Sequence, residues 1–300
     1  MTAPDVLGMM SPHRTRPAMS FQDLLLPLTS YPDPTPEAAL AGGAAIARRV
    51  GGELTALVFR ADIKAPRNRL ANLLIGMDAL AREEEARSET QAQATLQAFV
   101  AAAAREGLAA QTLVEQVPLF LEGERAAEQA RTRDLSLVPV GPSVLADVSL
   151  AEAVLFGSGR PVLVYPEALP LTPADRFGTV AVAWDGGRAA ARAVADALPL
   201  LKAAGEVRAV VVTDEKPAAR PGLAAPLVRH LQAHGVEARV DEIPAQGEPI
   251  GRVLRAYVAG KGIDLLVMGG FGHSRAREFV LGGATANLLD APPCPVLLAH

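Results

Sequence analysis

The chain is poor in the residues on which several classes of protein depend. Only one of its 300 residues is cysteine, which excludes an internal disulfide and favours a reducing cytoplasm. Aromatic residues make up 4% of the chain, too few for a base-stacking surface, and the net charge of -4 argues against a nucleic-acid partner. No apolar run is long enough to span a membrane. We therefore expect a cytoplasmic protein whose partners are neither nucleic acids nor membranes.

The beginning of the chain does not resemble a secretory signal. Residues 1–19 mix proline, arginine, histidine and methionine without a continuous apolar stretch, so we expect a disordered tail. The remaining length suits two domains of ordinary size, at residues 20–170 and 171–300. Three prolines punctuate a predicted linker at residues 166–175.

The two halves repeat one order of predicted elements. Each half opens with an apolar strand, which is followed by an alanine-rich helix and further strands. The predicted strands are 21–28, 54–59, 111–117, 135–140 and 161–164, and then 177–184, 207–213, 236–243, 265–268 and 295–298. This alternation predicts two tandem α/β domains, each with an open, parallel, Rossmann-like sheet. We expect the two last strands to pair with each other, because tandem copies can cover each other's exposed edges.

A glycine pattern follows the predicted strand 265–268 in the second half. It consists of Gly269, two residues, Gly272, nine residues, and then Gly282-Gly283-Ala284-Thr285. Glycine lets a backbone turn sharply and approach a ligand closely, because it has no Cβ. Free N–H groups at the start of a following helix suit a phosphate. The pattern therefore predicts a phosphate-binding loop.

These residues resemble the nucleotide-binding members of the universal stress protein family, which carry Gly-x-x-Gly, nine residues, Gly, and then Ser or Thr. Residues 180–186 resemble the first strand of that family, which ends in an acidic residue at the adenosine end of the pocket. The resemblance implies adenine-nucleotide alpha-hydrolase-like domains, with ATP and Mg²⁺ held in the second one. One position departs from the pattern: Gly283 stands where the family has Ser or Thr, so a hydroxyl donor to phosphate is missing.

The predicted nucleotide site joins the carboxyl ends of the strands to this loop. The resemblance assigns Asp185 to adenosine recognition, and a helix N-cap is the alternative. Thr285 either caps the last helix or contacts phosphate. The full set of expected nucleotide-binding residues is Asp185, Val212, Met268, Gly269, Gly272, His273, Ser274, Gly282, Gly283, Ala284 and Thr285.

The first half lacks the corresponding features. Thr29 stands where the second half has Asp185, and Pro142 follows Gly141 and removes a backbone donor. The segment between the last two predicted strands is also shorter in the first half. We therefore expect a degenerate first domain and nucleotide in the second half only.

Two further features have simple interpretations. Cys294 lies between two prolines without a sequence neighbour that would activate its thiol, so we interpret it as a small apolar filler. His230 and His234 are spaced for one face of a helix, but no third metal ligand is evident. We interpret the histidine pair as an exposed helix face.

The leading functional hypothesis is a nucleotide-dependent regulatory or interaction module of the stress response, as the resemblance implies. It would bind an adenine nucleotide, pair its own two domains and offer a surface for a homodimer. The alternative is a scaffold or interaction protein with both pockets empty, which is favoured if Gly283 abolishes phosphate binding. A third hypothesis is a weak ATPase or nucleotidyl-transferring enzyme. The chain has neither a Walker-type Gly-Lys-Ser/Thr motif nor an evident general base, which argues against this third class.

Overall fold

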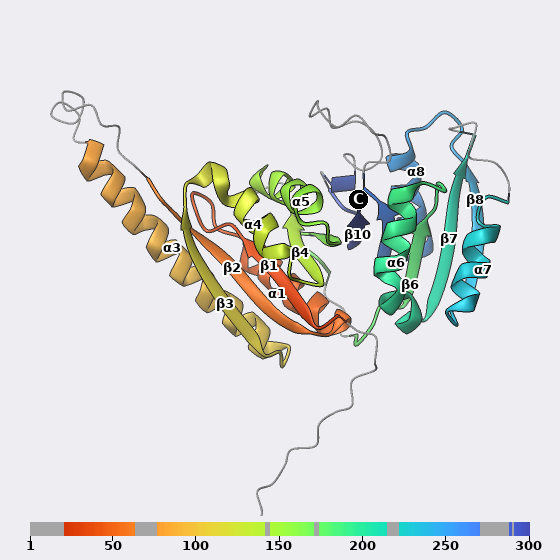
Figure 1. Cartoon of the computed structure of the whole chain (residues 1–300), viewed down its shortest axis with the longest axis horizontal. Helices are drawn as coiled ribbons and strands as arrows, with labels where there is room; N and C mark the ends of the chain where they lie inside the picture. Colours follow the sequence, from red (N-terminus) through yellow and green to blue (C-terminus); the bar gives the residue numbers. More distant parts are fainter. Residues whose placement is uncertain are drawn as a thin grey trace, which may run out of the picture.

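A computed structural model describes residues 21–63, 77–141, 145–170, 174–214, 222–270, 288–289 and 291–300. The predicted tail at 1–19 and most of the glycine pattern lie outside these residues. Within the described residues, ten strands form one sheet in the order β3-β2-β1-β4-β5-β10-β9-β6-β7-β8 (Figure 1). No helix in the described part of the chain is long and apolar enough to cross a membrane.

The first half contributes five strands and its helices. The strands are β1 (Asp23–Leu28), β2 (Glu53–Ala61), β3 (Ala110–Val117), β4 (Leu135–Val140) and β5 (Val162–Pro166). The helices are α1 (Glu37–Val50), α3 (Met77–Arg105), α4 (Glu122–Ala130) and α5 (Leu145–Ser158), with a short 3-10 helix at Leu119–Leu121. The predicted linker therefore begins after Pro166, which is still part of a strand.

The strands of the second half follow the same order as those of the first half: β8-β7-β6-β9-β10 corresponds to β3-β2-β1-β4-β5. Its strands are β6 (Thr179–Ala183), β7 (Glu206–Thr213), β8 (Ala238–Pro244), β9 (Leu265–Gly269) and β10 (Val296–Ala299). Its helices are α6 (Arg188–Ala203), α7 (Ala225–Ala233) and α8 (Ile250–Lys261). All strand neighbours within each half are parallel. The predicted α/β class with a mostly parallel sheet is confirmed.

Helices cover both faces of the sheet. One hydrophobic core contains side chains of α1, α3, α6 and α7, and the other contains side chains of α4, α5 and α8. The central strands consist mostly of apolar residues, as is typical of strands with both faces buried. The long helix α3 extends beyond the sheet in Figure 1, and only six of its residues are buried.

The halves join through their last strands. β5 and β10 pair antiparallel, with Val164 opposite Val296 and Val162 opposite Leu298. All four side chains are at most 1% exposed. The predicted pairing of the last strands is confirmed, and each strand covers an edge that the other half would otherwise expose.

Candidate functional site

The carboxyl ends of β6, β7 and β9 meet at one edge of the sheet. Ala183 of β6 pairs with Val210 of β7 on one side and with Met268 of β9 on the other. Asp185, two residues beyond Ala183, therefore lies at the same edge as Val212, two residues beyond Val210. The tertiary structure brings together Asp185, Val212, Met268 and Gly269. The remaining predicted ligand residues, Gly272, His273, Ser274, Gly282, Gly283, Ala284 and Thr285, lie outside the described residues.

Asp185 occupies a sharp turn between β6 and α6. Its Oδ1 accepts a hydrogen bond from the N–H of Gly187 at 2.8 Å, and Gly186 between them has φ of 74°. A left-handed φ is readily adopted only by glycine, so the sequence Asp-Gly-Gly allows this turn. A Cβ at Gly187 would lie 2.9 Å from Asp185 Oδ1. The carboxylate is exposed to solvent, and its Oδ2 has no hydrogen-bond partner within the described ranges.

The N-cap alternative for Asp185 is wrong in its strict form. The N-cap residue of α6 is Gly187, which makes no side-chain capping bond. Asp185 precedes the cap by two residues and bonds its backbone instead. The first turn of α6 contains no acidic residue, so the carboxylate that lies closest to this helix end is Asp185 itself, at the N-cap N–H.

Gly269 packs directly against this helix end. A Cβ at Gly269 would lie 2.5 Å from the backbone nitrogen of Ala190 and 2.8 Å from the carbonyl carbon of Ala189. These neighbours are backbone atoms of the first turn of α6, so they cannot move aside like a flexible side chain. The absence of a side chain at Gly269 therefore allows the end of β9 to lie against the amino end of α6. The glycine pattern begins beside N–H groups that suit an anion.

Trp184 is a residue of this edge that the sequence did not single out. Its backbone N–H donates to the carbonyl of Val210 at 2.8 Å, and its indole Nε1–H donates to the carbonyl of Leu223 at 3.2 Å. Leu223 also lies 3.3 Å from the position of a Cβ on Gly186. Trp184 thereby fixes the segment beside the Asp185 turn. It is the only tryptophan in the chain, and this rarity is the one sequence signal that could have identified it.

The equivalent edge of the first half is filled by protein atoms. Strand pairing places Leu24 opposite Leu135 and Val180 opposite Leu265, so Thr29 takes the place of Asp185. Thr29 is only 4% exposed, and its hydroxyl lies 3.1 Å from the hydroxyl of Thr35. By the same register Phe59, which is 1% exposed, replaces the half-buried Val212. A buried ring and a closed threonine turn therefore occupy the region where the second half exposes a carboxylate.

The charges around the first-half edge also disfavour an anion. The N-cap of α1 is Pro36, and its first turn carries Glu37. The Glu167 side chain packs against Gly141 beyond β4, since a Cβ there would lie 2.0 Å from the carboxylate. Carboxylates near both positions repel a phosphate. These contacts support the expectation of a first half without a nucleotide.

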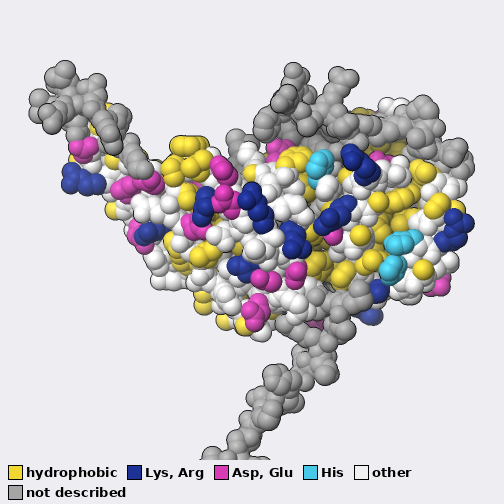
Figure 2. Space-filling model, in the orientation of Figure 1, with side chains coloured by type: hydrophobic (Ala, Val, Ile, Leu, Met, Phe, Trp, Pro, Cys, Tyr) yellow, Lys and Arg dark blue, Asp and Glu magenta, His cyan; other side chains and the backbone are white. Residues whose placement is uncertain are grey.

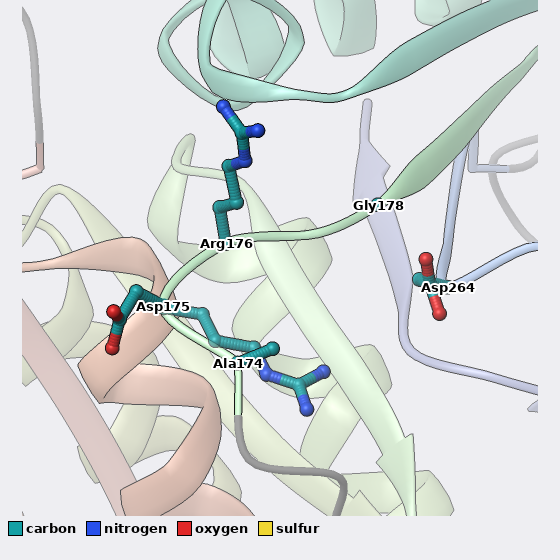
Figure 3. Close-up of a pocket in the computed structure, with 6 residues that line it drawn as sticks. Ala174, Asp175, Arg176, Gly178 and Asp264 are labelled. Carbon is teal, nitrogen blue, oxygen red and sulfur yellow. The ribbon is translucent and has the colours of Figure 1, made fainter.

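A cavity of about 440 Å³ lies at the opposite, amino end of the strands (Figure 3). Its lining includes Asp175 and Arg176 of the segment between the halves, and Asp264, which precedes β9. In Figure 3 the Arg176 side chain extends away from Asp264. Asp264 accepts the N–H of Thr179 at 2.8 Å, and Asp175 forms an ion pair with Arg48 at 2.8 Å. Both carboxylates of this cavity are therefore engaged in local contacts.

Cys294 and the histidine pair lie where the sequence interpretation placed them, in a core and on a helix. Cys294 is 6% exposed within the second core, and burial raises the pKa of its thiol to about 12. The rings of His230 and His234 contact each other edge to face, with centroids 4.7 Å apart. Within the described ranges, no group of three histidine, cysteine or acidic residues could hold a metal ion. On the face shown in Figure 2, acidic and basic side chains are intermixed.

Comparisons with known proteins agree with this architecture. The model of the universal stress protein family matches residues 176–300. A protein of Thermus aquaticus, described as a universal stress protein in the QAH/OAS sulfhydrylase 3' region, is 33% identical over 138 residues, which are 99% of that protein and 41% of this chain.

Two solved structures resemble almost the whole chain. A universal stress protein from Archaeoglobus fulgidus DSM 4304 matches with a TM-score of 0.66 and 17% identity, over 94% of this chain and 97% of that chain. A protein from Pseudomonas aeruginosa UCBPP-PA14 matches with a TM-score of 0.50 and 16% identity, over 93% of each chain. At these identities the similarity concerns the fold, and it extends over both halves.

Proposed function

Because the chain belongs to the universal stress protein family, we propose that its second half binds ATP or a related adenine nucleotide. The family places the protein in the stress response. Our proposal adds that nucleotide occupancy regulates the contacts of the protein with its partners in the cytoplasm, a location that the single cysteine supports.

The packing of Gly269 against the first turn of α6 is the observation that supports this proposal most. It brings the start of the glycine pattern to the first turn of α6, which contains no acidic residue. Such an end attracts phosphate through its free N–H groups and its dipole. The side-chain contacts of Asp185 leave one carboxylate oxygen available at the same edge. A carboxylate oxygen accepts hydrogen bonds from hydroxyl or amine groups, which suits the adenosine part of the ligand.

Magnesium fits this site as a companion of the nucleotide. Two described carboxylates follow strands at this edge: Asp185, which is assigned to the adenosine end, and Asp214 after β7, whose two oxygens accept the N–H groups of Ala245 and Gln246. Mg²⁺ commonly binds through one or two carboxylates, substrate phosphates and waters. We therefore expect the ion to arrive with ATP and to be coordinated mainly by phosphate oxygens and waters.

Binding, rather than catalysis, is the function that this edge supports. Asp185 already orients its turn by accepting the N–H of Gly187, and Asp214, directly after β7, accepts the N–H groups of Ala245 and Gln246. A hydrolytic enzyme requires a group that orients or activates water next to the phosphates. Neither of these two described carboxylates has both oxygens free of backbone hydrogen bonds for that task.

The experiment is a direct measurement of bound nucleotide and stoichiometry. Acid extraction of the purified chain followed by chromatography identifies any nucleotide that it retains, and calorimetry with ATP, AMP and adenosine counts the sites. We expect one adenine-nucleotide site per chain, and Gly282→Val should abolish it. Two equal sites would contradict the assignment to the second half, and the absence of any adenine-nucleotide binding would favour the scaffold alternative.

A further inference from the structure

Gly270, the residue directly after β9, is held by groups that lead back to the first half. Its N–H donates to the carbonyl of Ala299 in β10 at 2.8 Å. Its own carbonyl oxygen lies 3.2 Å from Nδ1 of His300. A Cβ at Gly270 would lie 2.8 Å from Cδ2 of Leu155, a side chain of α5. The strand end therefore contacts β10 and its following histidine on one side and a helix of the other half on the other.

A ring contact reinforces this connection. Phe156 of α5 meets the ring of His300 edge to face, with centroids 5.0 Å apart and planes at 78°. Edge-to-face pairs at this distance are a favoured aromatic geometry. Phe156 thus supports the same histidine whose Nδ1 faces the Gly270 carbonyl. Leu155 and Phe156 are consecutive residues of α5. Leu155 lies directly against Gly270, and Phe156 contacts His300, which in turn faces the Gly270 carbonyl.

The first half does not repeat this arrangement at its own strand end. Leu135 of β4 and Leu265 of β9 occupy equivalent positions in the sheet, since each pairs with the first strand of its half. Val140 is therefore the residue equivalent to Gly270. Val140 carries a side chain that is 1% exposed and belongs to the hydrophobic core. The close approach of Leu155 to a glycine is therefore a property of the second half, where the glycine pattern begins.

We propose that α5 of the first half, through Leu155 and Phe156, positions the strand end from which the nucleotide-binding loop of the second half begins. This inference rests on the proposed function and assigns a role to the half that lacks a nucleotide pocket. A binding segment that starts from a fixed anchor loses less conformational entropy when a ligand orders it. Leu155 and Phe156 act as positioning residues, because they reach the ligand only through Gly270.

A purely structural role for α5 predicts a different result. Loss of core packing lowers stability and weakens every ligand to a similar degree. A positioning role at the start of the loop affects the phosphate end, so ATP binding weakens while adenosine binding does not. The comparison of these two ligands distinguishes the two roles.

The test is calorimetry of the full-length chain with ATP and with adenosine, together with thermal unfolding. We expect Leu155→Ala to weaken ATP binding on the order of fivefold, with adenosine affinity within about twofold of the wild type. Leu155→Met, which retains most of the side-chain volume, should restore ATP affinity. Leu150→Ala is the matched control, because Leu150 is 5% exposed and Leu155 is 3% exposed on the same helix.

The outcomes separate this inference from the proposed function. ATP affinity that is unchanged in Leu155→Ala, or reduced equally in Leu150→Ala, overturns the inference and leaves the proposed function standing. A wild-type chain that binds no adenine nucleotide overturns both. If Leu155→Ala does not fold, Phe156→Ala replaces it, because that side chain is 49% exposed and its loss spares the core. Selective weakening of ATP then supports the inference, and an unchanged ATP affinity overturns it.

Discussion

Leu163 and Leu297 lie opposite each other at the centre of the antiparallel junction, and they occupy equivalent positions in the two halves. Leu163 pairs with Leu137 in β4, and Leu297 pairs with Val267 in β9, the residue equivalent to Leu137. The two flanking pairs, Val164 with Val296 and Val162 with Leu298, are related by the same symmetry, because Val164 is equivalent to Leu298 and Val162 to Val296. A local twofold relation between β5 and β10 therefore passes through this leucine pair.

The first prediction concerns this junction. Both leucines are fully buried, so Leu163→Glu places an unpaired charge between the two halves. We expect a loss on the order of 3–5 kcal/mol in the free energy of unfolding, measured by urea denaturation. Phe120→Glu is the control, because Phe120 is 85% exposed and the change should alter stability little. A wild-type unfolding midpoint in Leu163→Glu would show that the junction contributes little to stability.

The second prediction tests the contact between β9 and α6. Gly269→Ala places a Cβ against backbone atoms of α6, so we expect lower stability and weaker ATP binding. Gly260→Ala is the control, because a Cβ there meets nothing within 4 Å. Alanine at that position in α8 should raise stability by up to about 1 kcal/mol. Equal ATP affinity in the two variants would contradict the assigned role of the contact.

The glycines of the first half are not neutral control sites. A Cβ at Gly141 would lie 2.0 Å from the Glu167 carboxylate, and one at Gly157 would lie 2.8 Å from the Cβ of Ala127. Substitution at either position disturbs local packing, so a loss of stability there would not report on nucleotide binding.

The third prediction concerns the adenosine end of the site. Asp185→Ala removes the available carboxylate oxygen and the acceptor for the Gly187 N–H. We expect calorimetry to show about a tenfold loss of affinity for both ATP and adenosine. Asp175→Asn, at the amino end of the sheet, serves as the control and should bind both ligands normally. A loss for ATP alone would place Asp185 at the phosphates instead.

The fourth prediction concerns Gly283, which lies outside the described residues. Serine at this position matches the family pattern and adds one hydroxyl donor. Such a hydrogen bond to a charged acceptor contributes roughly 1.5–3 kcal/mol, so Gly283→Ser should tighten ATP binding about tenfold or more. Adenosine affinity should change little. Equal tightening for both ligands would show that residue 283 does not face the phosphates.

The fifth prediction concerns the pH dependence of stability. Burial raises the pKa of Glu122, at the start of α4, from 4.5 to about 7. The folded state then binds one more proton than the unfolded state between these values, so stability falls as pH rises from about 4.5 to about 7. Urea unfolding at pH 5 and pH 8 should show this loss, on the order of 1–3 kcal/mol.

Two variants on α4 isolate the effect of Glu122. Glu122→Gln removes the titrating group and should flatten the pH profile, whereas Glu124→Gln, at an exposed position of the same helix, should leave the profile unchanged. A profile that is equally steep in Glu122→Gln and the wild type would assign the pH dependence to another group.

The sequence predicted the strands well where burial is local and continuous. The mostly apolar segment 135–140 coincides with β4, because both faces of this strand lie in the core. Prediction was less accurate at β8, which begins at Ala238 rather than at Val236. Val236 is buried, but its N–H bonds to the carbonyl of Leu231 at the end of α7. An apolar residue that packs in a helix-ending turn has the same sequence signal as one in a strand.

Some features of the candidate site could be predicted from the sequence, and others could not. The sequence by itself determined the fold class, the pairing partners β5 and β10, and the placement of Asp185 and Gly269 at the carboxyl ends of their strands, because apolar periodicity and glycine placement are local signals. Only the tertiary structure decided that Phe59 fills the edge of the first half and that Leu155 reaches Gly270. Both contacts depend on how side chains from distant parts of the chain pack together. Such packing is set by the assembled shape of the sheet and its helices, which no local pattern encodes.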